Sequence, residues 1–420
     1  MNIDTQTSKK KNQKNGAATS AESEENSGGQ KTVVDDFSAE LIKQINKEHN
    51  DKIAFNLGTG EAPTVVKRWI STGSRQLDYI ISNVRNGGLP EGRIVEIQGP
   101  PSCGKSHIGF ELAKSTQQQN GIVVYVDTEN ATSLDNLKQL GIDVRKRFVF
   151  VQSACTEEIF QVMESAIIKA KGMSADVPVT IIWDSVAASS PKAELEGDYD
   201  QNTIGLQARV LGKGLRKITN LIGNKNILLV LMNQQRMKVG VLYGDPTTTP
   251  GGMAIPYACS VRLRISTGKP IEINGQTVGI GVTVKTIKNK ISRPFREAQF
   301  EIHFGKGVRE AEQLFDTLRG FCSTAKDGIK ANGKTLYLEG TGAWKTFKVI
   351  DQKTGEVEHE VKFYKNEFAE KILNVPQFQG FITDMMDAAL IMNPEDTDHF
   401  TFSSSQDGEP GQNNNTEAVS

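Results

Sequence analysis

Short apolar runs alternate with amphipathic stretches over residues 63–305. Each run is rich in β-branched residues and apolar on both faces, which is typical of parallel strands that helices cover on both sides. The runs occupy residues 93–98, 122–127, 148–151, 179–184 and 227–233. Apolar residues recur at helical spacing in the stretches between them, notably 106–118, 157–170 and 205–222. This alternation predicts an α/β core, with a mostly parallel twisted sheet flanked by helices.

Three further runs, at residues 260–266, 281–287 and 298–303, follow without long helices between them. Asn274 and Gly275 form a dipeptide of the kind that joins antiparallel strands. These runs therefore predict antiparallel additions to the sheet. Residues 306–400 have a less regular pattern and predict a small α+β domain at the C-terminal side of the core.

The two ends of the chain differ from this core. Residues 1–32 and 401–420 are low-complexity polar segments, so we expect both to be disordered tails. Residues 35–49 carry apolar side chains at helical spacing, namely Phe37, Leu41, Ile42 and Ile45. This narrow stripe fits packing on the chain's own core or docking on a neighbouring subunit, and the pattern does not separate the two. The predicted domains are 1–32, 33–62, 63–305, 306–400 and 401–420.

The charge balance excludes a protein that binds nucleic acid through bulk positive charge. Lys and Arg total 49, Asp and Glu total 50, and the formal net charge is -1. Any nucleic-acid site must therefore be a local patch. No apolar run approaches the roughly 20 residues of a membrane-spanning helix. The charged N-terminus is not followed by the apolar stretch of a secretory signal, so we expect no contact with a membrane.

The cysteines and histidines narrow the possible class of protein further. Cys103, Cys155, Cys259 and Cys322 lack metal-ligand spacing, and a large core does not need a disulfide framework. We expect reduced thiols and a cytoplasmic protein. The five histidines are scattered along the chain, which argues against a metal site built from side chains alone.

A nucleotide-binding motif follows the first apolar run directly. Residues 99–106 read G-x-x-x-x-G-K-S between a predicted strand and a predicted helix, which is the context this motif requires. Its glycines let backbone N–H groups curl around phosphate oxygens, and the helix start adds partial positive charge. Lys105 would reach the β- and γ-phosphates, and the Ser106 hydroxyl would bind Mg²⁺. The predicted cofactors are ATP and Mg²⁺, held by Gly99, Pro100, Pro101, Ser102, Cys103, Gly104, Lys105 and Ser106.

Three carboxylates stand at the ends of predicted strands. Asp184 ends one apolar run, at the edge of the sheet beside the phosphate loop, where it can hold the Mg²⁺ shell. Asp127 and Glu129 stand at the end of another run, and a carboxylate there can orient and deprotonate an attacking water. By itself Glu129 could equally be an exposed acid at a strand end. Together with the phosphate loop and Asp184 it predicts an ATPase.

Five segments between residues 70 and 300 resemble those of the RecA family of recombinases: ISTGSRQLDYI, GGLPEGRIVEIQGPPSCGKS, WDSVAASSPKAELEGD, NQQRMKVGVLYGDPTTTPGG and KNKISRPF. The resemblance implies a RecA-like P-loop ATPase that forms a right-handed helical filament on single-stranded DNA. It also implies homologous pairing with double-stranded DNA, strand exchange and DNA-dependent ATP hydrolysis, in recombination and repair. Such a protein would be bacterial or phage-encoded and would act in the bacterial or host cytoplasm, with single-strand-binding and loader proteins as further partners.

The same resemblance implies roles for individual residues. Glu129 would activate the hydrolytic water, and Gln234 would sense the γ-phosphate at the start of a DNA-binding loop. Lys288 and Lys290 would reach across to the ATP of a neighbouring protomer. The helix at residues 35–49 would pack on the adjacent protomer, which favours the oligomer contact over packing on its own core.

Two loops, at about residues 194–209 and 233–252, would hold DNA. The second offers cationic side chains and glycines that let backbone N–H groups approach phosphates, namely Arg236, Lys238, Gly240, Gly251 and Gly252. By resemblance, Ile204 and Val239 would wedge between base triplets, and Arg209 would contact the DNA backbone. The first loop is acidic, so contact there should come from backbone amides and Arg209.

Three positions depart from the family pattern. Asn136 stands where an aromatic residue stacks on adenine in the family, which implies that stacking is lost and that nucleotide affinity or base preference is relaxed. Pro256 replaces a lysine that precedes an interface aromatic, here Tyr257. Ser266 and Thr267 replace an arginine pair that helps to bind the second DNA, although Arg264, Lys269 and Lys285 could substitute in part.

Two other functions fit the same motifs. A hexameric helicase or clock-type ATPase uses this fold, but the long loop at 233–252 and the K-N-K at 288–290 favour a recombinase. The second is a DNA-binding scaffold that binds ATP without turnover. The complete set of Lys105, Ser106, Glu129 and Asp184 argues against it.

Overall fold

The computed structural model describes residues 25–50, 52–60, 62, 64–173, 177–198, 205–222, 227–237, 247–325 and 327–392. The chain forms two compact units, residues 1–65 and residues 66–420. The first unit contains helix α1 (Glu25–Glu48) and the 3-10 helix η1 (Leu57–Thr59). Asn46 anchors the segment after the helix, because its Oδ1 accepts hydrogen bonds from the N–H groups of Ile53 and Ala54, each at 2.8 Å.

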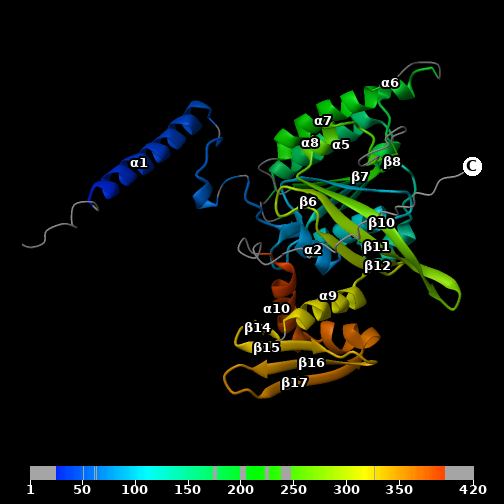
Figure 1. Ribbon diagram of the computed structural model, residues 1–420. Helices are drawn as coiled ribbons and strands as arrows, with labels where there is room; N and C mark the ends of the chain where they lie inside the picture. The colour runs from blue at the N-terminus through cyan, green and yellow to red at the C-terminus, as the bar shows by residue number, and fades with distance from the viewer. Residues whose placement is uncertain are drawn as a thin grey trace, which may run out of the picture. The chain divides into compact units, whose positions relative to one another are not determined.

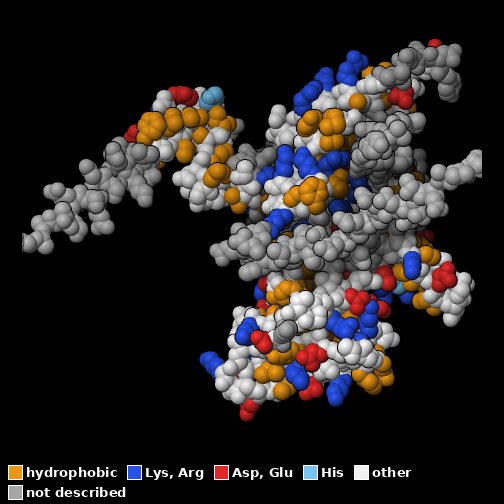
Figure 2. All heavy atoms as spheres, in the orientation of Figure 1, with side chains coloured by type: hydrophobic (Ala, Val, Ile, Leu, Met, Phe, Trp, Pro, Cys, Tyr) orange, Lys and Arg blue, Asp and Glu red, His pale blue; other side chains and the backbone are white. Residues whose placement is uncertain are grey.

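Large apolar side chains stay exposed on this first unit. Phe37 is 63% exposed, and Leu41, Ile53 and Leu57 are also exposed. Figure 2 shows hydrophobic side chains gathered on the surface of α1 and of the segment that follows it. The unit therefore presents apolar groups that it does not bury by itself.

Helix α1 begins at Glu25, earlier than the predicted start at residue 35. Residues 25–32 of the expected N-terminal tail fall within this helix, and residues 1–24 and 401–420 lie outside the described residues, so the expectation of disordered tails stays a prediction. The expectation of disorder rests on composition, which indicates whether a segment can bury apolar surface. A helix that is already nucleated instead gains one backbone hydrogen bond for each residue it adds, whether or not that residue is buried.

The second unit is built on a nine-stranded sheet with the order β13-β12-β11-β10-β3-β7-β6-β4-β5. The strands from β10 to β5 pair in parallel, and β11, β12 and β13 continue the sheet as antiparallel neighbours. This confirms the predicted α/β core. The strands are β3 (Ile94–Gly99), β4 (Ile122–Asp127), β5 (Phe148–Gln152), β6 (Val179–Asp184), β7 (Ile227–Gln234), β10 (Val261–Ile273), β11 (Gln276–Asn289), β12 (Glu297–His303) and β13 (Gly307–Arg309).

Helices cover both faces of this sheet (Figure 1). Alternate strand residues point to opposite sides. Val95, Val123 and Ile182 pack with α2 (Arg75–Ser82) and α3 (Lys105–Gln118). Val124, Ile181 and Trp183 pack with α5 (Thr156–Lys171) and α7 (Leu206–Ile222). The shorter helices are α4 (Leu134–Gln139), η2 (Val186–Ala188), α6 (Lys192–Leu195) and α8 (Ala254–Ala258).

Strand β5 departs from the expectation that every run is covered on both faces. Val149 and Phe150 are 48% and 45% exposed. The strand lies at the end of the sheet order and pairs only with β4 among the described residues. An edge strand has a neighbour on one side alone, so an apolar run can remain partly uncovered.

Two long strands, β10 and β11, form a hairpin that extends beyond their contact with β3. Asn274 and Gly275 turn the chain with φ of +52° and +75°. This is the left-handed backbone that a two-residue hairpin turn requires. The core also contains two pairs of short strands. Strand β1 (Trp69–Ile70) pairs with β2 (Leu89–Pro90), and β8 (Arg236–Met237) pairs with β9 (Thr247–Thr248).

The C-terminal part has its own antiparallel sheet, β14 (Ile329–Ala331), β15 (Lys334–Glu339), β16 (Trp344–Asp351) and β17 (Val357–Tyr364). Helices α9 (Ala311–Thr324) and α10 (Gln379–Leu390) lie between this sheet and the nine-stranded sheet (Figure 1). Three short helices join β17 to α10, namely η3 (Lys365–Glu367), η4 (Ala369–Leu373) and η5 (Pro376–Phe378). Tyr79 of α2 donates a hydrogen bond to Asp387 at 2.7 Å, and Arg85 pairs with Asp384 and Asp387. These contacts dock α10 against the core.

Candidate nucleotide site and DNA-facing loops

The phosphate-loop motif turns between β3, which ends at Gly99, and α3, which begins at Lys105. A Cβ on Gly99 would lie 2.6 Å from Ile265 atoms and 2.7 Å from the Cys103 sulfur, so only glycine fits. Gly104 has φ of +97°, which lets the loop enter the helix. Lys105 is nearly buried and donates to the carbonyls of Pro100 at 2.7 Å and Gly99 at 3.2 Å.

Asp184 stands opposite Asp127 across the parallel pair β4 and β6. Its Oδ2 accepts a hydrogen bond from the hydroxyl of Tyr125 at 2.7 Å. Burial raises the pKa of Asp184, hydrogen bonds from Ser106 and Tyr125 oppose the rise, and the carboxylates of Glu129 and Asp127 add to it. Three carboxylates thus lie near one another at the carboxyl edge of the sheet.

Glu129 is held from three strand ends. Its backbone N–H donates to Asp127 Oδ1 at 3.0 Å. Its side-chain Oε1 accepts hydrogen bonds from the Ser185 hydroxyl, just after β6, and from the Gln234 amide, at the end of β7. The carboxyl ends of parallel strands meet at one edge, which is why residues so far apart in sequence meet here.

Most of the predicted site residues line one cavity of about 460 Å³. Its predicted members are Pro101, Ser102, Cys103, Gly104, Lys105, Ser106, Glu129, Asp184 and Gln234. Gly99, Pro100 and Asp127 do not line it, but they hold the loop and the Glu129 backbone. Lys288 and Lys290 do not line it either; Lys288 donates to the carbonyl of Pro256.

The structure adds three residues that sequence reasoning missed. His107, Ile280 and Phe304 also line the cavity, and the rings of His107 and Phe304 are stacked with centroids 6.4 Å apart. Phe304 is 50% exposed. His107 follows the motif directly and could have been found there. No motif spacing in the sequence indicates Ile280 or Phe304. The order of the strands in the sheet, which no local motif contains, brings β11 and the end of β12 beside the phosphate loop.

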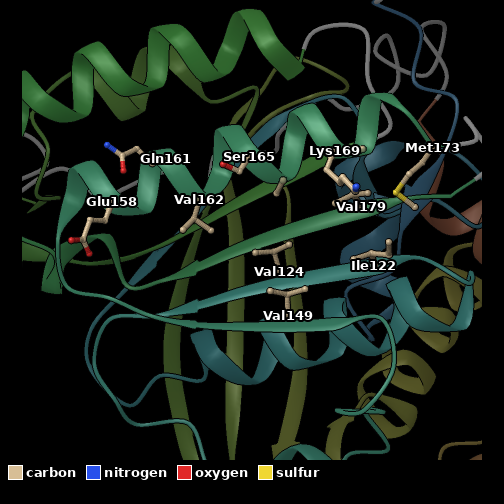
Figure 3. Close-up of a pocket in the computed structure, with 12 residues that line it drawn as sticks. Ile122, Val124, Val149, Glu158, Gln161, Val162, Ser165, Lys169, Met173 and Val179 are labelled. Carbon is tan, nitrogen blue, oxygen red and sulfur yellow. The ribbon is translucent and has the colours of Figure 1, made fainter.

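A second cavity, of about 540 Å³, lies between α5 and the edge of the sheet. Figure 3 shows Val162 and Ser165 of α5 above Ile122, Val124 and Val149 of the strands. We call it the edge pocket. Its lining is mainly apolar, with Glu158, Gln161 and Lys169 at its border.

Comparison with known proteins assigns the family. The family profile described as RecA N-terminal domain matches residues 37–309. The chain belongs to the RecA family. RecA from Thermus aquaticus is 40% identical over 268 residues, which cover 64% of this chain and 75% of that protein. RecA from Gluconobacter oxydans is 33% identical over 336 residues, covering 80% and 90%.

Membership of the RecA family makes the protein a DNA recombinase and a DNA-dependent ATPase. This confirms the function that the sequence motifs predicted and does not favour the hexameric helicase. Among the helices that the structure describes, none is long and apolar enough to cross a membrane.

The two loops expected to hold DNA are described in part. Arg209, near the start of α7, and Arg236, in β8, are exposed. Gly251 has φ of +94°, and a Cβ there would lie 2.8 Å from Leu211, so the end of the second loop requires glycine. Gly252 also has a positive φ, of +61°. Ile204, Lys238, Val239 and Gly240 lie outside the described residues.

The positions that depart from the RecA pattern can also be placed. Asn136 lies in α4 and does not line the nucleotide cavity. Ser266 and Thr267 are exposed on β10. Two cations that could substitute for the missing arginines are engaged, because Lys285 pairs with Glu297 at 2.8 Å and Arg264 donates to Thr247 at 3.0 Å.

Proposed function

We propose that the nucleotide cavity binds ATP, with the phosphates on the loop and the γ-phosphate toward Glu129 and Gln234. The observation that carries this proposal is the convergence of Lys105, Ser106, Asp184, Glu129 and Gln234 on one cavity. Backbone N–H groups at the start of α3 and the Lys105 ammonium supply the positive charge that a triphosphate requires. Phosphate oxygens would replace the loop carbonyls that now accept from Lys105.

The residues beside this cavity fit a magnesium ion. Mg²⁺ prefers hard oxygen ligands and usually takes one or two from protein, with the rest from phosphate and water. The Ser106 hydroxyl and the Asp184 carboxylate are such oxygens, and they contact each other. Asp184, Glu129 and Asp127 also raise the local negative charge. When bound, the ion would neutralise charge on the β- and γ-phosphates.

Glu129 is the proposed general base. Hydrogen bonds from Ser185 and Gln234 fix the direction of its carboxylate, and a water aligned with the γ-phosphate would pass its proton to that group. Lys288 and Lys290 are proposed to act on the ATP of a neighbouring protomer. Both follow from the resemblance, and their absence from the cavity of their own chain fits such a contact.

The first experiment measures phosphate release with and without single-stranded DNA. Lys105→Ala should lower DNA-stimulated hydrolysis by about a hundredfold or more, because the phosphates lose a fixed cation. Lys114→Ala, on the same helix but outside the cavity, is the matched control and should keep the parental rate. A Lys105→Ala variant that hydrolyses ATP at the parental rate contradicts the assignment.

We further propose that loops 194–209 and 233–252 hold single-stranded DNA. Exposed Arg209 and Arg236 support this, because each can contact a phosphate, and Gly251 and Gly252 allow close backbone approach. Double-stranded DNA would contact the surface around Ser266 and Thr267, where few cationic side chains are available to hold its phosphates. Single-strand-binding and loader proteins, and a cytoplasmic site of action, remain predictions.

Self-assembly is proposed to use the edge pocket of a second copy. The first unit exposes Phe37, Leu41, Ile53 and Leu57, and the edge pocket is an apolar cavity beside the half-exposed strand β5. The segment between α1 and η1, which carries Ile53, can pair with such an edge while apolar side chains of the unit enter the pocket. Repetition of this head-to-tail contact would generate a filament.

A further inference from the structure

A single hydroxyl group reaches Asp184 from the interior of the core. Tyr125, in the middle of β4, is fully buried and donates to Asp184 Oδ2 at 2.7 Å. Its ring stacks against Phe110 of α3 at 5.6 Å, and against Phe148 and Phe150 of β5 at 6.3 and 6.4 Å. The position of the ring is therefore set by packing on two sides.

A phenylalanine would fill nearly the same space at position 125. Its neighbours Val123, Val124 and Val126 in β4 are apolar and buried, so the hydroxyl is the one polar group in this part of the strand. A buried tyrosine hydroxyl needs a hydrogen-bond partner. Here the partner is the carboxylate proposed to hold Mg²⁺, so the hydroxyl does more than complete the core.

The backbone fixes the distance between the two groups. Strands β4 and β6 pair in parallel, with Tyr125 opposite Ile182 and Asp127 opposite Asp184. Neither strand can slide without moving every pair in the central sheet. The hydroxyl therefore meets the same carboxylate oxygen whenever the core is folded, and the contact with Ser106 marks the direction in which the carboxylate faces the cavity.

We propose that Tyr125 is a positioning residue, which holds the Asp184 carboxylate in the orientation needed to bind Mg²⁺ with the nucleotide. This inference rests on the proposed nucleotide site. The Tyr125 hydroxyl supplies the hydrogen of this bond, and the Asp184 carboxylate accepts it. Partners of this kind orient metal-binding groups, and their removal typically weakens metal affinity by about 10–100-fold.

The test is Tyr125→Phe, which keeps the ring and removes the hydroxyl. A fluorescent ATP analogue is titrated onto the full chain in EDTA and across a MgCl₂ series. We expect the Mg²⁺ concentration for half-maximal binding to rise by about tenfold, while affinity in EDTA stays at the parental value. That pattern separates a metal effect from a general loss of the site.

Tyr79→Phe is the matched control. Tyr79 donates to Asp387 at the same 2.7 Å distance, but at the contact with α10, away from the cavity. It should leave the Mg²⁺ requirement unchanged, and melting temperatures report how far each variant is destabilised. A Tyr125→Phe shift of threefold or less, or one matched by Tyr79→Phe, overturns the proposal.

A double-mutant cycle adds a second measurement. In the Asp184→Asn background, Tyr125→Phe should cause no further change in the Mg²⁺ requirement, because the two residues act as one unit. Additive shifts would overturn the proposal. A parent chain that binds the analogue without any Mg²⁺ dependence overturns the proposed metal site together with it, whereas a normal parent with an unshifted variant overturns only the role of Tyr125.

Discussion

The side-chain amide of Gln234 donates a hydrogen bond to Glu129 across 2.9 Å. Gln234 ends β7, immediately before the second loop proposed to hold DNA, and Glu129 follows β4 at the edge of the nucleotide cavity. The residue proposed to activate water is thus held by the residue from which the DNA loop starts. If that loop holds DNA as proposed, we expect its movement on DNA binding to act on this hydrogen bond and so to link DNA binding to hydrolysis.

Glu129→Gln should bind ATP but hydrolyse it about 10²–10⁴-fold more slowly, because an amide cannot accept the proton of the attacking water. The DNA-bound filament should persist as a result. Nucleotide binding, phosphate release and filament lifetime are measured together. Glu356→Gln, at an exposed position in the turn between β16 and β17, serves as the control. Parental turnover by Glu129→Gln would rule out the general-base role.

Val162→Glu should convert assembled protein to smaller species, because it places a charge in the edge pocket. Ile168→Glu changes a 60%-exposed residue of the same helix that does not line the pocket, and assembly should be unaffected. Deletion of residues 1–49 should also leave a folded, mostly monomeric core. Light scattering after size exclusion measures all three. Long filaments formed by Val162→Glu would exclude the edge pocket as the docking site.

Replacement of Arg236 and Lys238 by Ala should weaken binding of single-stranded DNA and flatten its salt dependence. Each lost phosphate contact should reduce the slope of log affinity against log salt by about 0.7. Fluorescence anisotropy of a labelled oligonucleotide across a salt series gives this slope. Lys353→Ala removes an exposed cation from the turn between β16 and β17 and should not change the slope. An unchanged slope for the loop variant would place the first DNA strand elsewhere.

Arg at positions 266 and 267 should strengthen capture of a second, duplex DNA and leave the first-strand affinity nearly unchanged. Both positions are exposed on β10, and the nearby Lys285 is paired with Glu297, so two added arginines should raise the positive charge that faces a duplex there. The measurement is binding of labelled duplex to preformed filaments at several salt concentrations. Capture no better than that of the parent would indicate that the second site lies in another part of the chain.

Asp78 predicts a pH dependence of stability. Burial raises its pKa to about 7, although Ser71 and Thr72 donate hydrogen bonds to it. The folded state therefore keeps a proton that the unfolded chain releases near its ordinary pKa of 3.8. The stabilising contribution is complete below that value and is lost as pH rises to about 7, by up to about 1.4 kcal/mol per pH unit.

Asp78→Asn cannot ionise and should abolish this slope. Urea unfolding of parent and variant at pH 5, 6, 7 and 8 gives the difference in free energy, which should change between pH 5 and 7 and level off above 7. Asp135→Asn, at an exposed position, is the control. A constant difference over the whole range would show that Asp78 ionises with the same pKa in both states.

Much of the nucleotide site could be predicted because its signals are local. The eight residues 99–106 are contiguous, so their spacing alone defines the turn from strand to helix. Asp184 and Glu129 could be added because apolar runs with helices between them form parallel strands, whose carboxyl ends meet at one edge. Strand β6 has the predicted bounds, and β3 and β7 end one residue later than predicted. Periodicity determined these elements because each must bury a defined face.

Only the tertiary structure decided which distant side chains complete the site. Phe304 lines the cavity and Tyr125 reaches Asp184 because of strand order and register, which no local pattern contains. The exposure of β5 likewise depends on its place at the edge of the sheet. The raised pKa of Asp78 arises from burial, and the charge of Glu310, remote in sequence, adds to it. Local periodicity sets what each segment can form, whereas contacts between segments set the surroundings, and hence the chemistry, of each side chain.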